Sequence, residues 1–296
     1  MTIKYANIIY TNNWAPDNRA YRDRQAQSMF EAEEARYSML RALRYSQDRR
    51  LRSLEKQLDA SCRYSILPNT RKSYNLSLCS VCIERTRRTL ISAVTSLLRR
   101  RFRDGELSAS WVEVDVPDQR YQRCDLYRID LPSLNRQIQQ QYAKVGFPLA
   151  FSSVNILCIQ KYRMKNKRFG DECNEGEPFW QARICSVIVG PPRRDVISAI
   201  RTLYPRQSFE EWRHLDVEEA LRSTIKTGFF EEWINKDNNR TIIEPLFNGD
   251  CELAYCFGRH NMSVRYVLTG CRLTDGEIEL NKGVERRLKQ LAHEIV

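Results

Sequence analysis

The stretch Phe179–Pro192, FWQARICSVIVGPP, gives the clearest indication of the fold. The run is mostly apolar, β-branched or aromatic, and a Gly-Pro-Pro sequence ends it, so we predict a long, largely buried strand. We predict strands for two further stretches as well: Phe151–Gln160, FSSVNILCIQ, and Ser110–Val116, SWVEVDV. The strict alternation of the latter is typical of a half-buried strand, which we expect Pro117 to end.

Helical patterns of unequal length separate these strands. Apolar residues recur at helical spacing, or a capping pattern opens the segment, in the ranges 131–144, 195–204, 216–226, 251–257 and 283–296. Residues 229–250 read as loop-rich. Because the order shows no regular βαβ rhythm, we predict an α+β fold with an antiparallel sheet and flanking helices.

The N-terminal part differs in composition. Residues 22–61 contain neither Gly nor Pro and are rich in helix-forming residues, which predicts a long basic helix or a helical hairpin. A second basic, amphipathic helix is predicted over residues 83–102. We therefore divide the chain into a basic helical arm (1–61), a segment with a cysteine pair and a basic helix (62–106), an α+β domain (107–272) and a helical tail (273–296).

The charge balance points to a polyanionic partner. The 296 residues include 48 Lys and Arg against 37 Asp and Glu, a formal net charge of +11. Such a chain is expected to bind nucleic acid, and we favour DNA. Arginines at the start of the predicted helix 83–102 oppose the helix dipole, which suggests a role in phosphate contacts. The predicted nucleic-acid contacts are Arg85, Arg87, Arg88, Arg99, Arg100, Arg101, Arg103 and Lys226.

Because the N-terminus does not resemble a secretory signal, we expect the ten cysteines to be reduced and do not interpret them as a disulfide framework. Cys79 and Cys82 have the spacing of half a zinc site, and Cys62 is the candidate third ligand; the alternative is that all three are plain thiols. No run of 18 apolar residues occurs, and the N-terminus does not resemble a secretory signal. We therefore expect a cytoplasmic protein without a membrane partner.

Common catalytic motifs are absent from the sequence. The three histidines, at positions 214, 260 and 293, have no metal-binding spacing. The phosphate-binding pattern GxxxxGK[ST], the dinucleotide-binding pattern GxGxxG and the nucleophile pattern GxSxG do not occur. Familiar nucleotide-binding and hydrolase classes are therefore not indicated.

The order of parts resembles the rolling-circle replication initiators of plasmids and phages, the His-hydrophobe-His nickase superfamily. The resemblance covers about residues 60–272 and makes 107–272 the initiator-like domain. It rests on the cysteine pair before a basic helix, the three strands described above, the helix ending Leu203-Tyr204-Pro205, and the stretches Ala220–Lys226 and Val267–Arg272.

The resemblance implies a specific centre. In that family two histidines at positions i and i+2 of one strand hold a divalent metal such as Mg²⁺ or Mn²⁺, and a tyrosine on a nearby helix attacks the scissile phosphate. The matching positions here are Arg183, Cys185 and Ser223, so all three depart from the pattern. Arginine has no lone pair for a metal, and we therefore predict a degenerate, inactive nickase centre in which Arg183 could hold a phosphate.

Glu113 and Asp115 lie on one face of the predicted strand Ser110–Val116. They are either solvated acids, which we favour, or groups that orient Arg183 or a metal.

Three functions remain open. The first is a DNA-binding protein resembling a replication initiator, with the inactive centre just described. The second is an active DNA-nicking and -joining enzyme with a divergent metal site. The third is an interaction module that self-associates or docks a partner through its long N-terminal helix.

Overall fold

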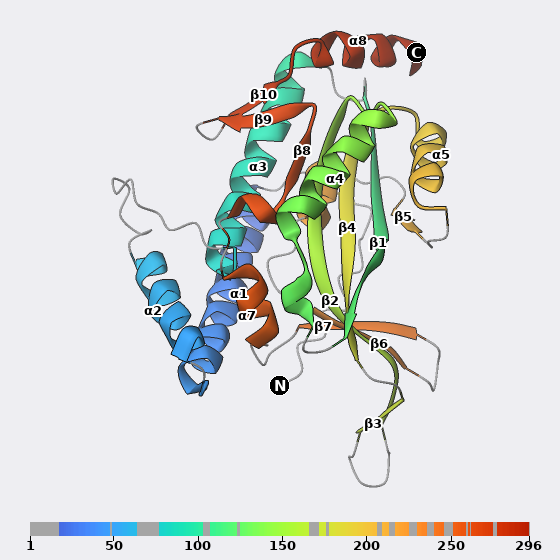
Figure 1. The fold of residues 1–296 in the computed structure, drawn as a ribbon. Coiled ribbons are helices and arrows are strands. Elements are labelled where there is room, and N and C mark those ends of the chain that lie inside the picture. Colours follow the sequence, from blue (N-terminus) through green and yellow to red (C-terminus); the bar gives the residue numbers. More distant parts are fainter. Residues whose placement is uncertain are drawn as a thin grey trace.

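The predicted strand 179–189 is strand β4, Phe179–Gly190, and it runs through the middle of a mixed sheet (Figure 1). The computed structural model describes residues 18–47, 49–63, 77–102, 107–122, 125–165, 172–175, 178–205, 209–212, 217–224, 230–235, 240–245, 251–258, 260, 262–274 and 277–295. None of the helices in these ranges is long and apolar enough to cross a membrane.

The sheet has the order β5-β1-β4-β2-β6-β7 within the described residues, and β3 and β8 also pair with β2. All pairs are antiparallel except β2 with β6. The strands are β1 Ser108–Gln122, β2 Leu149–Lys165, β3 Glu172–Glu175, β5 Phe209–Trp212, β6 Phe230–Asn235, β7 Arg240–Pro245 and β8 Val267–Thr269, with a separate hairpin of β9 Cys271–Thr274 and β10 Glu277–Leu280. The predicted α+β fold, with an antiparallel sheet and flanking helices, is confirmed.

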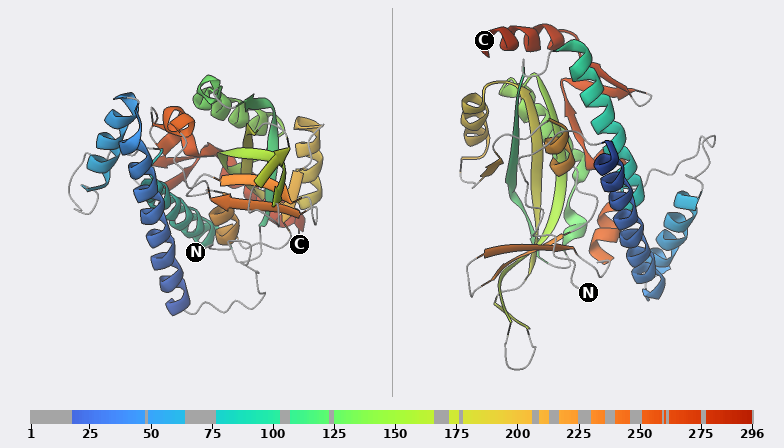
Figure 2. Two further views of the ribbon diagram at one scale, coloured as in Figure 1. Left: turned by 90° about the horizontal axis from the view of Figure 1, so that it is seen from below. Right: turned by 180° about the vertical axis from the view of Figure 1, so that it is seen from behind.

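Helices cover both faces of the sheet (Figures 1 and 2). They are α1 Asn18–Tyr45, α2 Arg49–Arg63, α3 Ser80–Arg101, α4 Leu131–Lys144, α5 Arg193–Leu203, α6 Val217–Thr224, α7 Cys251–Phe257 and α8 Val284–Ile295, with 3-10 turns η3 Leu126–Arg128 and η4 Met262–Arg265. Helix α4 lies on one face. On the opposite face α6 packs against β4, and α3 packs against α6.

Helix α4 is held to the sheet by buried hydroxyl groups. Its N-cap residue Asp130 accepts a hydrogen bond from the Ser133 amide at 3.0 Å, as expected for a helix start. Near its other end the hydroxyl groups of Tyr142 and Ser186 lie 2.8 Å apart, and Ser186 donates to Ser152 at 2.8 Å. Burial raises the pKa of Tyr142 to about 12, so this hydroxyl stays protonated.

The N-terminal helices form the hairpin that the sequence allowed. Helix α1 packs on α3, where the Ser80 hydroxyl donates to the Ala32 carbonyl at 2.6 Å. Helix α2 returns alongside α1, with Arg36 lying 3.8 Å from Asp59. The hydrophobic core includes residues from all four predicted segments, from Ala32 in α1 to Leu288 in α8. The arm therefore shares one core with the sheet.

Two local predictions were wrong. Strand β1 does not end at Pro117 but continues to Gln122 after a register shift between Asp115 and Arg120, an irregularity that lets the strand accommodate a proline. The range 229–250, predicted to be loop-rich, contains β6 and β7. Strand β6 forms because it pairs with the part of β2 from Leu157 to Arg163. No local sequence pattern predicts this contact between distant segments.

Candidate site at the centre of the sheet

The registers of three neighbouring strands bring polar side chains together on the face opposite α4. Directly opposed residues of an antiparallel pair lie on the same face of the sheet. A residue of β4 and the residues opposite it in β1 and β2 therefore form one row across the three strands. The first row is Asp115, Arg183 and Asn155, and the second is Glu113, Cys185 and Ser153. Each row thus combines residues far apart in the sequence.

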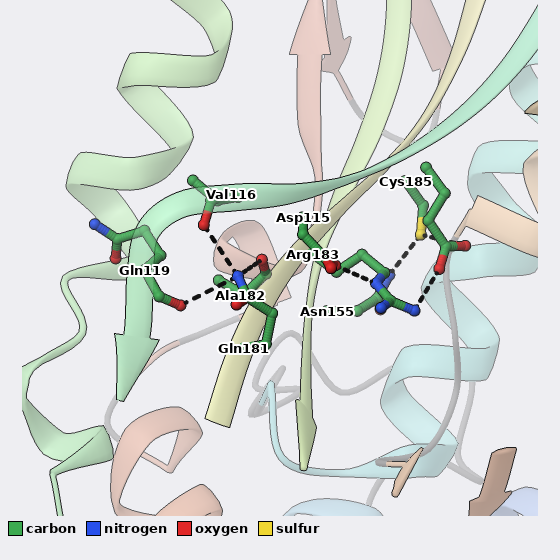
Figure 3. A network of polar contacts seen from close by, with 9 residues as sticks. Asp115, Val116, Gln119, Asn155, Gln181, Ala182, Arg183 and Cys185 are labelled. Atoms are coloured by element: carbon green, nitrogen blue, oxygen red, sulfur yellow. Dashed lines mark hydrogen bonds and ion pairs between the residues drawn. The ribbon is translucent and has the colours of Figure 1, made fainter. Parts of the chain in front are cut away.

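Arg183 is bound by two carboxylates (Figure 3). Its Nε donates to Asp115 Oδ1 at 2.5 Å, and one terminal nitrogen donates to Glu113 Oε1 at 2.9 Å. The three side chains are only 12%, 27% and 11% exposed, respectively. The favoured prediction that these acids are solvated was therefore wrong, and the alternative, that they orient Arg183, is confirmed.

The network extends through Cys185, which is fully buried. Asn155 Nδ2 donates to Cys185 Sγ at 3.2 Å, and Sγ lies 3.4 Å from Glu113 Oε2 (Figure 3). Beside it, Gln181 Nε2 donates to the Val116 carbonyl at 3.0 Å, bracing the irregular part of β1. Sequence reasoning missed Asn155 and Gln181, although polar amides within otherwise apolar strands were a visible signal.

The donor set of this network does not suit Mg²⁺ or Mn²⁺. The guanidinium of Arg183 has no lone pair, and both carboxylates already accept hydrogen bonds from it. The described part of the chain contains no group of three or more His, Cys, Asp or Glu residues that could hold a metal. We therefore derive no metal-dependent step from this centre.

Helix α6 covers this face of the sheet and contains Ser223 (Figure 2). Ala220, Leu221 and Thr224 are buried, while Ser223 is half-buried. The structure therefore brings the helix with the predicted nucleophile position against the strand with the predicted ligand positions. That Ser223 performs chemistry stays a prediction.

The arginines at the start of α3 have an acidic partner that the sequence analysis missed. Glu84 is 0% exposed and lies 2.5 Å from a terminal nitrogen of Arg87 and 2.8 Å from Nε of Arg88. Burial lowers the pKa of Arg87, and the attraction of Glu84 opposes this effect. Arg85, like Arg87 and Arg88, is half-buried. Glu84 thus gives Arg87 and Arg88 a structural role beside any contact with nucleic acid.

The arginines at the other end of α3 lie at the surface. Arg99, Arg100 and Arg101 are exposed, and Arg101 approaches Glu285 of α8 at 3.4 Å. Two further predicted contacts, Arg103 and Lys226, lie outside the described residues.

The predicted zinc ligands cannot all be compared in the structure. Cys79 and Cys82 are buried free cysteines, Cys79 at the N-cap of α3 and Cys82 in its first turn. Cys62 lies in α2, and its side chain is outside the described part. A closed zinc site requires four ligands, so zinc stays a prediction.

Comparisons with protein-family models, with curated proteins and with solved structures give no match to this chain. Any functional statement therefore rests on the residues described above.

Proposed function

We propose that this chain is a cytoplasmic DNA-binding protein that resembles a replication initiator and carries an inactive centre at the middle of its sheet. The observation that carries the proposal is the exposed run Arg99–Arg101 in the last turn of α3. Cations in the last turn suit the helix dipole, and their exposure leaves them accessible to phosphates.

The arrangement of the other predicted contacts supports the same reading. The guanidinium groups of Arg87, Arg88 and Arg183 are paired with carboxylates, so a phosphate would have to displace Glu84 or Glu113 to reach them. Among the described residues, the acid that approaches the exposed run is Glu285, which is itself partly exposed and also pairs with Lys289 at 2.9 Å. Affinity for DNA is therefore expected to depend mainly on the exposed arginines.

The inactive centre is supported by the residues that stand at the family's ligand positions. Arg183 places a fixed cation where the resemblance implies a metal ligand, and two carboxylates hold it there. Cys185, at the second position, is buried and contacts Asn155 and Glu113. These contacts explain the presence of both residues by a structural role that involves no catalysis.

The test is DNA binding by fluorescence anisotropy over a salt series, with wild type and the triple variant Arg99→Glu, Arg100→Glu, Arg101→Glu. Loss of about three phosphate contacts should flatten the slope of log affinity against log salt by about 2 to 3. The triple lysine variant at the same positions preserves the charge and should keep the slope. An unchanged slope in the glutamate variant would contradict the proposal.

A second assay decides between the inactive and the active nickase. Wild type is incubated with single-stranded and hairpin DNA and with Mg²⁺ or Mn²⁺, and denaturing gels are examined for a covalent protein–DNA adduct. We expect none. An adduct that the Ser223→Ala variant fails to form would establish the enzymatic alternative.

A further inference from the structure

Helix α8 adds a second group of cations beside those of α3. The exposed basic residues at this end of the molecule are Arg99, Arg100, Arg101, Lys144, Arg193, Arg194, Lys282, Arg286, Arg287 and Lys289. We call this set the basic end. It collects residues from the C-terminal turns of α3 and α4, the start of α5, the turn before α8 and the first half of α8 (Figure 1).

Three contacts hold α8 across this end. At its start, Glu285 reaches Arg101 of α3. In its middle, Arg287 lies against Gly146, just after α4, where a Cβ would come within 3.0 Å of its guanidinium. Further along, Leu288 packs at the end of β4, where a Cβ on Gly190 would lie 2.8 Å from it.

The position of α8 gives this surface a defined extent. A helix of 12 residues is about 18 Å long, so α8 extends from α3 across the ends of α4 and β4. Arg193 follows Gly190 by three residues, which places the start of α5 at the far side of the same surface. An extent of about 18 Å corresponds to roughly half a turn of duplex DNA.

Among the described residues at this end, the acids Glu285 and Asp195 each lie beside a cation. Glu285 accepts from Lys289 at 2.9 Å, and this hydrogen bond lowers its pKa. Asp195 lies 3.5 Å from Arg194. The described cations at this end outnumber these two acids, which leaves a positive surface. Arg193 and Arg194 also begin α5, where the helix dipole disfavours positive charge, so helix stability does not explain their presence.

Among the described residues, the basic end has no exposed aromatic side chain on which a base could stack. The exposed large hydrophobic residues of the described chain are Phe30, Tyr37, Tyr45 and Tyr127, which lie on α1 and η3. Proteins that hold single strands usually combine cations with such aromatic platforms. A surface of cations alone is suited to the phosphate backbone of a duplex, without reading its sequence.

We propose that the basic end binds the backbone of duplex DNA and that α8 supplies contacts of its own. This inference rests on the proposed function and deepens it, since it names the form of DNA and adds an element that the sequence analysis treated only as a tail. It makes α3 and α8 two halves of one binding surface.

The test uses the full chain with a duplex of about two helical turns and its isolated strand. The variant Arg286→Glu, Arg287→Glu, Lys289→Glu should weaken duplex binding by about tenfold or more at roughly 0.15 M salt and flatten the salt slope by about 2 to 3. Of the three contacts that hold α8, this variant removes only that of Arg287, while Glu285 and Leu288 are unchanged. If the glutamate variant fails to fold, the corresponding glutamine variant serves in its place.

A matched control changes the net charge equally at another place. Arg49, Arg52 and Lys56 are exposed on α2, and replacing all three with glutamate should weaken binding much less. Equal weakening by the α2 and α8 variants would mean that affinity follows net charge, and would overturn the proposal. Tighter binding of the single strand than of the duplex would also overturn it.

The failure of this inference and that of the proposed function are distinguishable. If the α3 variant loses affinity and the α8 variant binds as wild type does, the proposed function stands and the role of α8 is refuted. If wild type binds no DNA at about 0.15 M salt, the proposed function itself fails.

Discussion

Removing the guanidinium of Arg183 is the most direct perturbation of the sheet centre. In Arg183→Met the aliphatic part of the side chain is largely preserved, but Glu113 and Asp115 lose the cation that both contact. Each hydrogen bond to a charged group contributes about 1.5–3 kcal/mol, and loss of one partner of a fully buried ion pair costs about 3–5 kcal/mol. Because these side chains keep some exposure, we expect a loss of about 2–3 kcal/mol in the free energy of unfolding.

The assay is urea denaturation at neutral pH, with Arg272→Met as the matched control. Arg272 also forms an ion pair, with Glu279 at 2.7 Å, but the two side chains are 73% and 47% exposed. Exposed pairs contribute about 0–1 kcal/mol, so the control should lose far less stability. A double-mutant cycle that adds Glu113→Gln should show a coupling above about 1 kcal/mol.

Equal, small losses in Arg183→Met and the control would refute the reasoning that Arg183 is a structural cation. The same variant also tests the phosphate role that the sequence suggested for it. If the role of Arg183 is only to stabilise the sheet, the folded Arg183→Met variant should bind DNA with the affinity of wild type. A marked loss of affinity in the folded variant would instead establish a phosphate contact.

Four other predictions concern single substitutions, one of them with a control substitution of its own. Glu84→Gln removes a fully buried carboxylate from two arginine partners and should cost about 2–4 kcal/mol in urea denaturation; a loss under about 0.5 kcal/mol would contradict this. Gly270→Ala, at φ +77° with its Cβ 1.8 Å from a backbone carbonyl oxygen, should prevent folding or lower the melting temperature strongly. Gly283→Ala, at φ +88° with nothing within 4 Å of its Cβ, is the control and should cost only about 1 kcal/mol; equal losses would refute the clash. Burial raises the pKa of the Cys271 thiol from 9.0 to about 12, so wild type loses stability as pH rises above 9.0, because the unfolded chain releases this proton first. The stability difference between wild type and Cys271→Ala should therefore narrow from about pH 8 to about pH 10, whereas a constant difference would argue against this. The Tyr37 side chain on α1 is 64% exposed. If the N-terminal helices serve as an interaction module, Tyr37→Ser should weaken self-association, measured by sedimentation, without changing the affinity for DNA.

Local sequence patterns are sufficient to predict the main strands and helices. The strands around Trp111, Val154 and Ile184 and the helices 131–144 and 283–296 lie where the apolar patterns predicted them. These patterns are local, because a strand or helix that buries one face must repeat its apolar residues at its own period. Period-two alternation also placed Glu113 and Asp115 correctly on one face of their strand.

Which residues those faces contact depends instead on how the strands pair and how the helices pack. That Arg183 lies opposite Asp115 depends on β4 pairing with β1 in one register, and a shift of one residue would place the two on opposite faces. The gathering of α3 and α8 cations at one end likewise depends on how the C-terminal helix crosses the sheet. Pairing and docking bring together residues far apart in the chain, and their energies depend on burial and neighbouring charges that no local pattern contains.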